Sequence, residues 1–138
     1  MILPRLDEGL ETSGRSRADF EISGGGFVAT GADDEAVNKV FEWVRMRIGF
    51  YGSTPSYWPV FEQHGWEDLG HKLNDMSKKG QWDQMTQEVS DDIVHEFCAV
   101  GRFDQIADKI RQRFAGRVDV ISLPDDAPND LLQELANI

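Results

Sequence analysis

Apolar residues recur at helical spacing over residues 35–51, every three or four positions along the chain. The strip consists of Val37, Val40, Phe41, Val44, Ile48 and Tyr51. Asp33 and Asp34 stand directly before it, where acidic residues favour the N-terminus of a helix. The pattern predicts one long amphipathic helix with a buried apolar face.

An aromatic cluster follows this helix, within residues 48–66. Its members are Phe50, Tyr51, Tyr57, Trp58, Phe61 and Trp66. Burying these rings is worth about as much free energy as ordering the segment costs. We therefore expect the segment to pack on a larger body and not to be stable by itself.

The rest of the chain is predicted to form shorter helices and two strands. The helical segments are residues 3–13, 55–65, 66–79, 81–89, 91–97, 103–114 and 125 to the C-terminus. Apolar and β-branched runs predict strands at residues 20–31 and 118–123. No convincing strand is expected between Gly52 and Val100.

Helices join the two predicted strands, which favours a right-handed parallel crossover. Parallel sheets are covered on both faces and contain more than two strands. Two strands alone leave open edges, which promote aggregation. We therefore expect either a second chain that supplies strands or a larger barrel of which this chain is a piece.

The 138-residue chain is short enough for one domain over residues 1–138, and its formal net charge is −11. That charge opposes binding to nucleic acids and to anionic membranes. The basic clusters Lys78-Lys79 and Arg111/Arg113/Arg117 are interpreted as solvated faces. No apolar run reaches the length of a membrane span, and the start lacks a signal-peptide pattern, so a cytoplasmic location is expected.

Candidate chemistry in the isolated sequence is sparse. His64, Glu67 and His71 suggest a metal site, but glycines interrupt the segment and the spacing matches no zinc motif, so no metal is expected. The single cysteine, Cys98, excludes an internal disulfide and is interpreted as a buried structural thiol. The triple glycine at residues 24–26 lacks the Lys and Ser/Thr of a phosphate loop.

The order of these segments resembles the luciferase-like flavin and deazaflavin oxidoreductases, and most closely an actinobacterial-type branch that uses coenzyme F-420. The segments that carry the resemblance are FVATG at 27–31, the helix 35–51, FYGSTPSY at 50–57, HGW at 64–66, FCAVG at 97–101, IADKIR at 106–111 and VDVIS at 118–122.

The resemblance implies a helix-rich α/β chain that forms the C-terminal fragment of a (βα)8 TIM barrel. The chain matches strands seven and eight with their helices, and residues 52–100 are a helical excursion between them. The family transfers hydride to or from F-420, or activates oxygen with reduced flavin as a monooxygenase. Its contacts to the cofactor lie mostly on strands one to six. We therefore expect the isolated chain to be inactive and to bind neither F-420 nor FMN tightly.

Barrel active sites gather at the carboxyl ends of the strands. This favours Thr30, Tyr51, Ser53 and Ser122 as walls of a substrate pocket, while no catalytic residue is identified. The alternative is that these side chains only satisfy caps and turns. A different class of function also stays open, namely a small non-enzymatic dimer. Its interface would be the aromatic excursion and the open strand edges.

Overall fold

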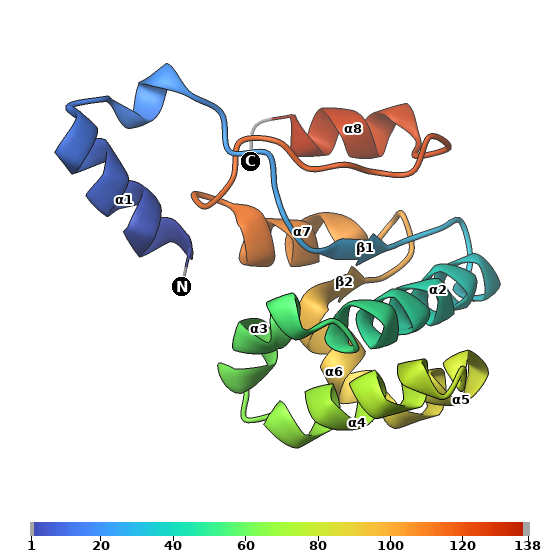
Figure 1. The fold of residues 1–138 in the computed structure, drawn as a ribbon. Coiled ribbons are helices and arrows are strands. Elements are labelled where there is room, and N and C mark those ends of the chain that lie inside the picture. The colour runs from blue at the N-terminus through green and yellow to red at the C-terminus, as the bar shows by residue number, and fades with distance from the viewer. Residues whose placement is uncertain (1, 137–138) are drawn as a thin grey trace.

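The structure is a computed structural model that describes residues 2–136 as a short parallel sheet between two layers of helices (Figure 1). The elements are α1 (Ile2–Ser13), η1 (Arg17–Asp19), β1 (Phe27–Ala29), α2 (Asp34–Gly52), η2 (Pro55–Tyr57), α3 (Trp58–Glu62), α4 (Glu67–Lys78), α5 (Trp82–Glu88), α6 (Asp91–Phe97), β2 (Cys98–Val100), α7 (Ile106–Phe114) and α8 (Asn129–Leu135). Each predicted helix is present, with shifts at its ends. The end of the last one, residues 137–138, lies outside the described residues.

The two regular strands, β1 and β2, pair in parallel, with Phe27 opposite Cys98 and Ala29 opposite Val100. The expectation that no strand lies between Gly52 and Val100 is therefore wrong. β2 follows α6 without an intervening turn residue, and three residues are too few for a periodic strand pattern.

The two strands predicted from the sequence are shorter than expected. Only Phe27–Ala29 of the predicted strand 20–31 is regular, because the triple glycine interrupts the ladder and Gly26 has φ 157°. The predicted strand 118–123 forms only an isolated parallel bridge, between Ser23 and Val120. Gly24 N–H donates to the carbonyl of Val120 at 3.0 Å. The two segments are therefore parallel neighbours, as predicted, without a continuous ladder.

Side chains alternate between the two faces of this sheet, and each face is covered by different helices. Ala29 and Cys98 belong to a core shared with α2 and the helices from α3 to α6, whereas Ala99 belongs to a core shared with α7 and α8. Figure 1 shows these two helical layers on opposite sides of β1 and β2. The chain thus surrounds its small sheet with helices on both faces.

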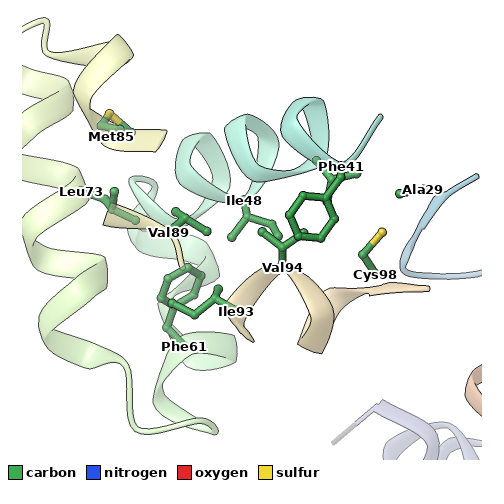
Figure 2. Close-up of a cluster of buried hydrophobic side chains, with 11 residues drawn as sticks. Ala29, Phe41, Ile48, Phe61, Leu73, Met85, Val89, Ile93, Val94 and Cys98 are labelled. Carbon is green, nitrogen blue, oxygen red and sulfur yellow. The ribbon is translucent and has the colours of Figure 1, made fainter. Parts of the chain in front are cut away.

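The larger core is built on the apolar strip of α2. Phe41, Val44 and Ile48 of this helix are at most 8% exposed. Figure 2 shows Phe41 and Ile48 on the side of α2 that faces the excursion, and all three residues share one core with Phe61, Leu73, Met85, Val89, Ile93 and Val94. The predicted buried face of the long helix is confirmed.

The first helix, α1, has no buried residue. It is joined to the rest through residues 17–24, where Arg17 forms an ion pair with Asp119 at 2.6 Å. Within residues 2–136, no helix combines the length and the apolar character needed to cross a membrane.

Candidate functional site

Thr30 directly follows β1 and is 2% exposed. Its Oγ1 atom is buried and has no hydrogen-bond partner among the described residues. Leaving a buried hydroxyl unpaired costs about 1–3 kcal/mol. Next to it, Phe103 N–H donates to the carbonyl of Gly31 at 3.0 Å, and Gly101 N–H donates to that of Ala29 at 3.1 Å. These contacts hold the loops at the carboxyl ends of both strands together around Thr30.

Tyr51 and Ser53 lie at the opposite end of α2. The Tyr51 hydroxyl accepts a hydrogen bond from Arg47 Nη2 at 2.9 Å. The Ser53 hydroxyl is buried and donates to the carbonyl of Phe50 at 2.7 Å. The backbone carbonyl of Ser53 accepts from Asn74 Nδ2 at 2.7 Å. Both side chains thus have partners within or beside the last turns of the helix.

An apolar pocket lies beside Tyr51, with a volume of about 150 Å³. It is lined by Ile48, Tyr51, Tyr57, Val60, Phe61 and Phe97. Ligand pockets commonly enclose about 300–1,000 Å³. This pocket therefore has room for a small apolar group and not for a flavin or deazaflavin ring system.

The four proposed pocket-wall residues do not meet at one place. Thr30 precedes α2, and Tyr51 and Ser53 lie at its end, so a 19-residue helix of about 28 Å separates them. Ser122 is exposed and lies on the segment 118–123, which runs beside Ser23, ahead of β1. The structure brings Tyr51 and Ser53 together and leaves the other two apart. Their contribution to a substrate pocket stays a prediction.

Among the suggested metal ligands His64, Glu67 and His71, the two histidines contact aromatic rings. The ring of His64 stacks on Trp66 at 4.5 Å between centroids, and that of His71 lies 4.2 Å from Trp58. Within residues 2–136, no three His, Cys, Asp or Glu side chains are grouped so that they could hold a metal ion.

Cys98 is buried, as predicted. Burial raises the pKa of the thiol to about 11, while a backbone hydrogen bond and the charge of Arg113 act in the opposite direction. The reactive thiolate is therefore scarce at neutral pH.

A cleft beside β2 holds basic side chains that the sequence analysis assigned to a solvated face. Arg111 does pair with carboxylates, Asp108 at 2.9 Å and Glu134 at 3.1 Å. Arg113 and Arg117 instead line the cleft together with Lys109, which was not among the basic clusters noted in the sequence. Lys109 and Arg113 are four residues apart, which places them on the same side of α7, and Arg117 follows the end of the helix.

Comparisons with known proteins relate the chain to one family. The family model "Luciferase-like monooxygenase" matches residues 1–119. Uncharacterized protein Mb1395 of Mycobacterium bovis is 45% identical over 117 residues, which are 85% of this chain and 34% of that protein. Uncharacterized protein Rv1360 of Mycobacterium tuberculosis matches with the same identity and the same coverage. The chain spans about a third of the length of these curated relatives.

Proposed function

Because this chain belongs to the luciferase-like monooxygenase family, we propose that it forms the carboxyl-terminal part of the (βα)8 barrel of a flavin- or deazaflavin-dependent oxidoreductase. The match over residues 1–119 carries the proposal. In it, the chain provides strands seven and eight with their helices, and residues 52–97, which precede β2, form the helical excursion. The reaction is hydride transfer with F-420, or with FMN as the alternative cofactor.

The sheet geometry supports this proposal. Ser23 and Val120 form a parallel bridge between the two segments predicted as neighbouring strands. Helix α7 precedes the second of these segments and α8 follows it, and both helices pack on the same core. The consecutive parallel strands β1 and β2 are joined through helices α2 to α6, which pack on one face, as in the repeating unit of a barrel.

The cofactor requires more protein than the described residues provide. The apolar pocket beside Tyr51 is about 150 Å³ in volume, which is too small for the ring system of either cofactor. Thr30 offers one unpaired hydroxyl. We therefore assign the main ring and phosphate contacts to the rest of the barrel, and the chain by itself is inactive.

The partner in this proposal is the polypeptide that covers the open strand edges. It is either the remainder of a longer protein or a second chain with the missing barrel strands. An uncovered sheet edge invites pairing with another strand, so a cover stabilises the chain as well as completing the site.

The test uses this chain and a chimera. In the chimera, residues 1–119 replace the matching segment of the Mycobacterium tuberculosis relative. Both proteins are titrated with F-420 and with FMN while cofactor fluorescence is recorded. We expect saturable binding by the chimera and by its parent, and none by the isolated chain. A folded chimera that binds neither cofactor while the parent binds one would overturn the proposal, as would tight binding by the isolated chain.

A second candidate function is a non-enzymatic dimer, supported by an exposed aromatic face on α2 and α5. Trp43, Met46 and Phe50 on α2 are 46–49% exposed, and Trp82 on α5 is 50% exposed. The rings of Phe50 and Trp82 lie 6.2 Å apart, beside a hollow of about 520 Å³. Apolar faces of this kind mark protein interfaces.

We expect this face to bind the same face of a second copy. Light scattering of the chain should then give twice the monomer mass, and Phe50→Glu should restore the monomer. Glu62→Gln, on the exposed side of the excursion, serves as the control. A monomeric parent chain would eliminate this candidate.

A further inference from the structure

The two faces of the β1–β2 sheet carry different helices. Phe27, Ala29 and Cys98 belong to the core formed with α2 and the helices from α3 to α6, whereas Val28 and Ala99 belong to the core formed with α7 and α8. Successive side chains of a strand alternate between its faces, so these two sets mark opposite sides of the sheet. We call the side with Val28 and Ala99 the α7 face. Helix, sheet and helix thus form three layers (Figure 1).

A (βα)8 barrel has helices on one face of its sheet only. The helices form an outer ring, and the opposite face of each strand lines the packed interior. The helices that join β1 to β2, from α2 to α6, therefore mark the outward face. The α7 face is then the side that would line the interior of the barrel. Because α7 and α8 occupy it in this structure, their present position is incompatible with a closed barrel.

The segment 118–123 also departs from the order of a barrel. Each strand of a barrel lies beside the strand before it in the chain, so this segment would pair with β2. Within residues 2–136, the regular sheet contains β1 and β2 alone, and Val120 bridges Ser23 ahead of β1. The chain thus steps from β1 to β2 and then back. Right-handed crossovers in opposite directions place their helices on opposite faces, which accounts for the position of α7.

Apolar burial holds α7 on this face. Ile106, Ala107, Ile110 and Phe114 of α7 are at most 6% exposed and share a core with Ala99. An amphipathic helix requires an apolar surface opposite its apolar strip, and the outward face of a sheet provides such a surface as well. The burial of α7 therefore depends on which surface is available and is not specific to the α7 face.

The polar contacts of α7 with β2 and α6 are exchangeable. Lys109 Nζ donates to the carbonyl of Val100 at 2.5 Å, and Arg113 donates to the carbonyls of Glu96 and His95, each at 2.7 Å. All three acceptors are neutral backbone groups. Hydrogen bonds of this kind contribute little net free energy, because water replaces them when they break.

Short segments with glycine connect α7 to its neighbours. Gly101 directly follows β2, and Gly116, with φ 70°, lies between the end of α7 and the segment 118–123. Hinges are a few loop residues that absorb changes in φ and ψ. The helix therefore has a hinge position at each end and can change faces while β1 and β2 stay paired.

We propose that α7 covers the α7 face only in the isolated chain and moves to the outward face when the remaining strands of the barrel are joined to it. The inference rests on the proposed function, because only a barrel has an interior that α7 must leave. In the isolated chain, α7 shields apolar strand surface that would otherwise promote aggregation. It also fills the side on which the barrel interior would form. The competing explanation is a chain that keeps its three layers permanently.

The test measures the distance between α2 and α7 by pulsed electron spin resonance. Spin labels are attached to Lys39→Cys on α2 and Gln112→Cys on α7, both at exposed positions, in a Cys98→Ala background. The proteins are the isolated chain and the chimera, whose residues 1–119 include both sites and whose other cysteines are replaced by serine. The control pair is Lys39→Cys with Gln87→Cys on α5, a helix on the same side of the sheet as α2. Circular dichroism verifies that all variants are folded.

We expect the distance between α2 and α7 to be shorter by about 10 Å or more in the chimera. Helices on opposite faces have the sheet between them, whereas neighbouring helices on one face lie about 8–10 Å apart. The control distance should be the same in both proteins. A short distance between α2 and α7 in the isolated chain would overturn the inference, as would an unchanged distance in the folded chimera.

Cofactor fluorescence reports on the proposed function separately. A folded chimera in which the distance shortens but no cofactor binds, while the parent relative binds one, contradicts the proposed function and supports the movement of α7. A chimera that binds a cofactor with the distance unchanged supports the proposed function and contradicts the movement.

Discussion

The ring of Phe61 occupies the space that a side chain on Gly52 would need. A Cβ atom on Gly52 would lie 2.4 Å from Phe61 Cζ and 3.0 Å from Leu73 Cδ1. The indole of Trp58 donates to the carbonyl of Gly52 at 3.0 Å. The excursion therefore folds back onto the last turn of α2 at a position where only glycine fits.

Gly52→Ala should destabilise the chain by about 1–3 kcal/mol, because the added methyl group overpacks the contact with Phe61. Gly49→Ala is the matched control on the same helix. Its added Cβ would meet no atom closer than 3.7 Å, so it should be neutral or stabilise by up to about 1 kcal/mol. Urea unfolding measures both free energies, and equal effects of the two substitutions would contradict the packing seen here.

Arg45 connects α2 with the start of α6, because its guanidinium donates to Glu42, to Asp91 and to the carbonyl of Val89. The side chain is only 12% exposed. Arg45→Ala should therefore cost about 1.5–3 kcal/mol of unfolding free energy, since it leaves the Val89 carbonyl without this charged donor. Lys39→Ala, on an exposed position of the same helix, should change it by less than about 0.5 kcal/mol.

Acid should loosen the attachment of residues 17–24 to Asp119. The Asp119 carboxylate accepts hydrogen bonds from Ile22 N–H at 2.7 Å and from Arg17 at 2.6 Å, and these lower its pKa from the ordinary value of 3.8. The stabilisation is therefore present above pH 3.8 and is lost as the pH falls through the lowered pKa.

Amide hydrogen exchange at Ile22, followed from about pH 6 down to about pH 2, measures this loss. Protection should decrease in the parent chain, and Asp119→Asn should remove the acid-dependent part. Asp125→Asn changes an exposed carboxylate outside this contact and should leave the profile unchanged. Protection in Asp119→Asn that falls as steeply as in the parent would exclude Asp119 as the responsible group.

Cys98 should resist alkylation while the chain is folded. Burial raises the pKa of its thiol to about 11, compared with 9.0 in an exposed position. Iodoacetamide near neutral pH should react slowly with the native chain and rapidly in denaturant. In the unfolded chain the Cys98 thiol ionises from pH 9.0 upward, and in the folded chain only near pH 11. The free energy of unfolding should therefore be retained below pH 9.0 and fall above it. Equal alkylation rates in the folded and unfolded states would show that the thiol is accessible.

Local sequence patterns correctly predicted the elements whose pattern is complete within their own residues. The strip from Val37 to Ile48 predicted the buried face of α2, because the helical period is a property of adjacent residues. The predicted helix 91–97 is present as α6, and the side chain of Ser90 directly before it accepts a hydrogen bond from Ile93 N–H. The parallel relationship of residues 20–31 and 118–123 also followed from the order of the elements.

Longer-range features had no such signal. β2 is regular only because Cys98–Val100 finds Phe27–Ala29 as a partner, and a strand of three residues has too little pattern to be recognised before its partner is known. In the same way, Thr30 and Tyr51 were predicted to share one pocket, but Thr30 lies before α2 and Tyr51 in its last turn, so most of this helix, about 28 Å long, separates them.

The sequence by itself determined the helices, the buried face of α2 and the family, because periodicity, caps and the order of segments are written along the chain. Only the tertiary structure decided which groups each cation of α7 meets. Arg111 and Arg113 are two residues apart, yet one meets Glu134 and the other meets the carbonyls beside β2. Adjacent positions on a helix point to different neighbours, and those neighbours come from distant parts of the chain.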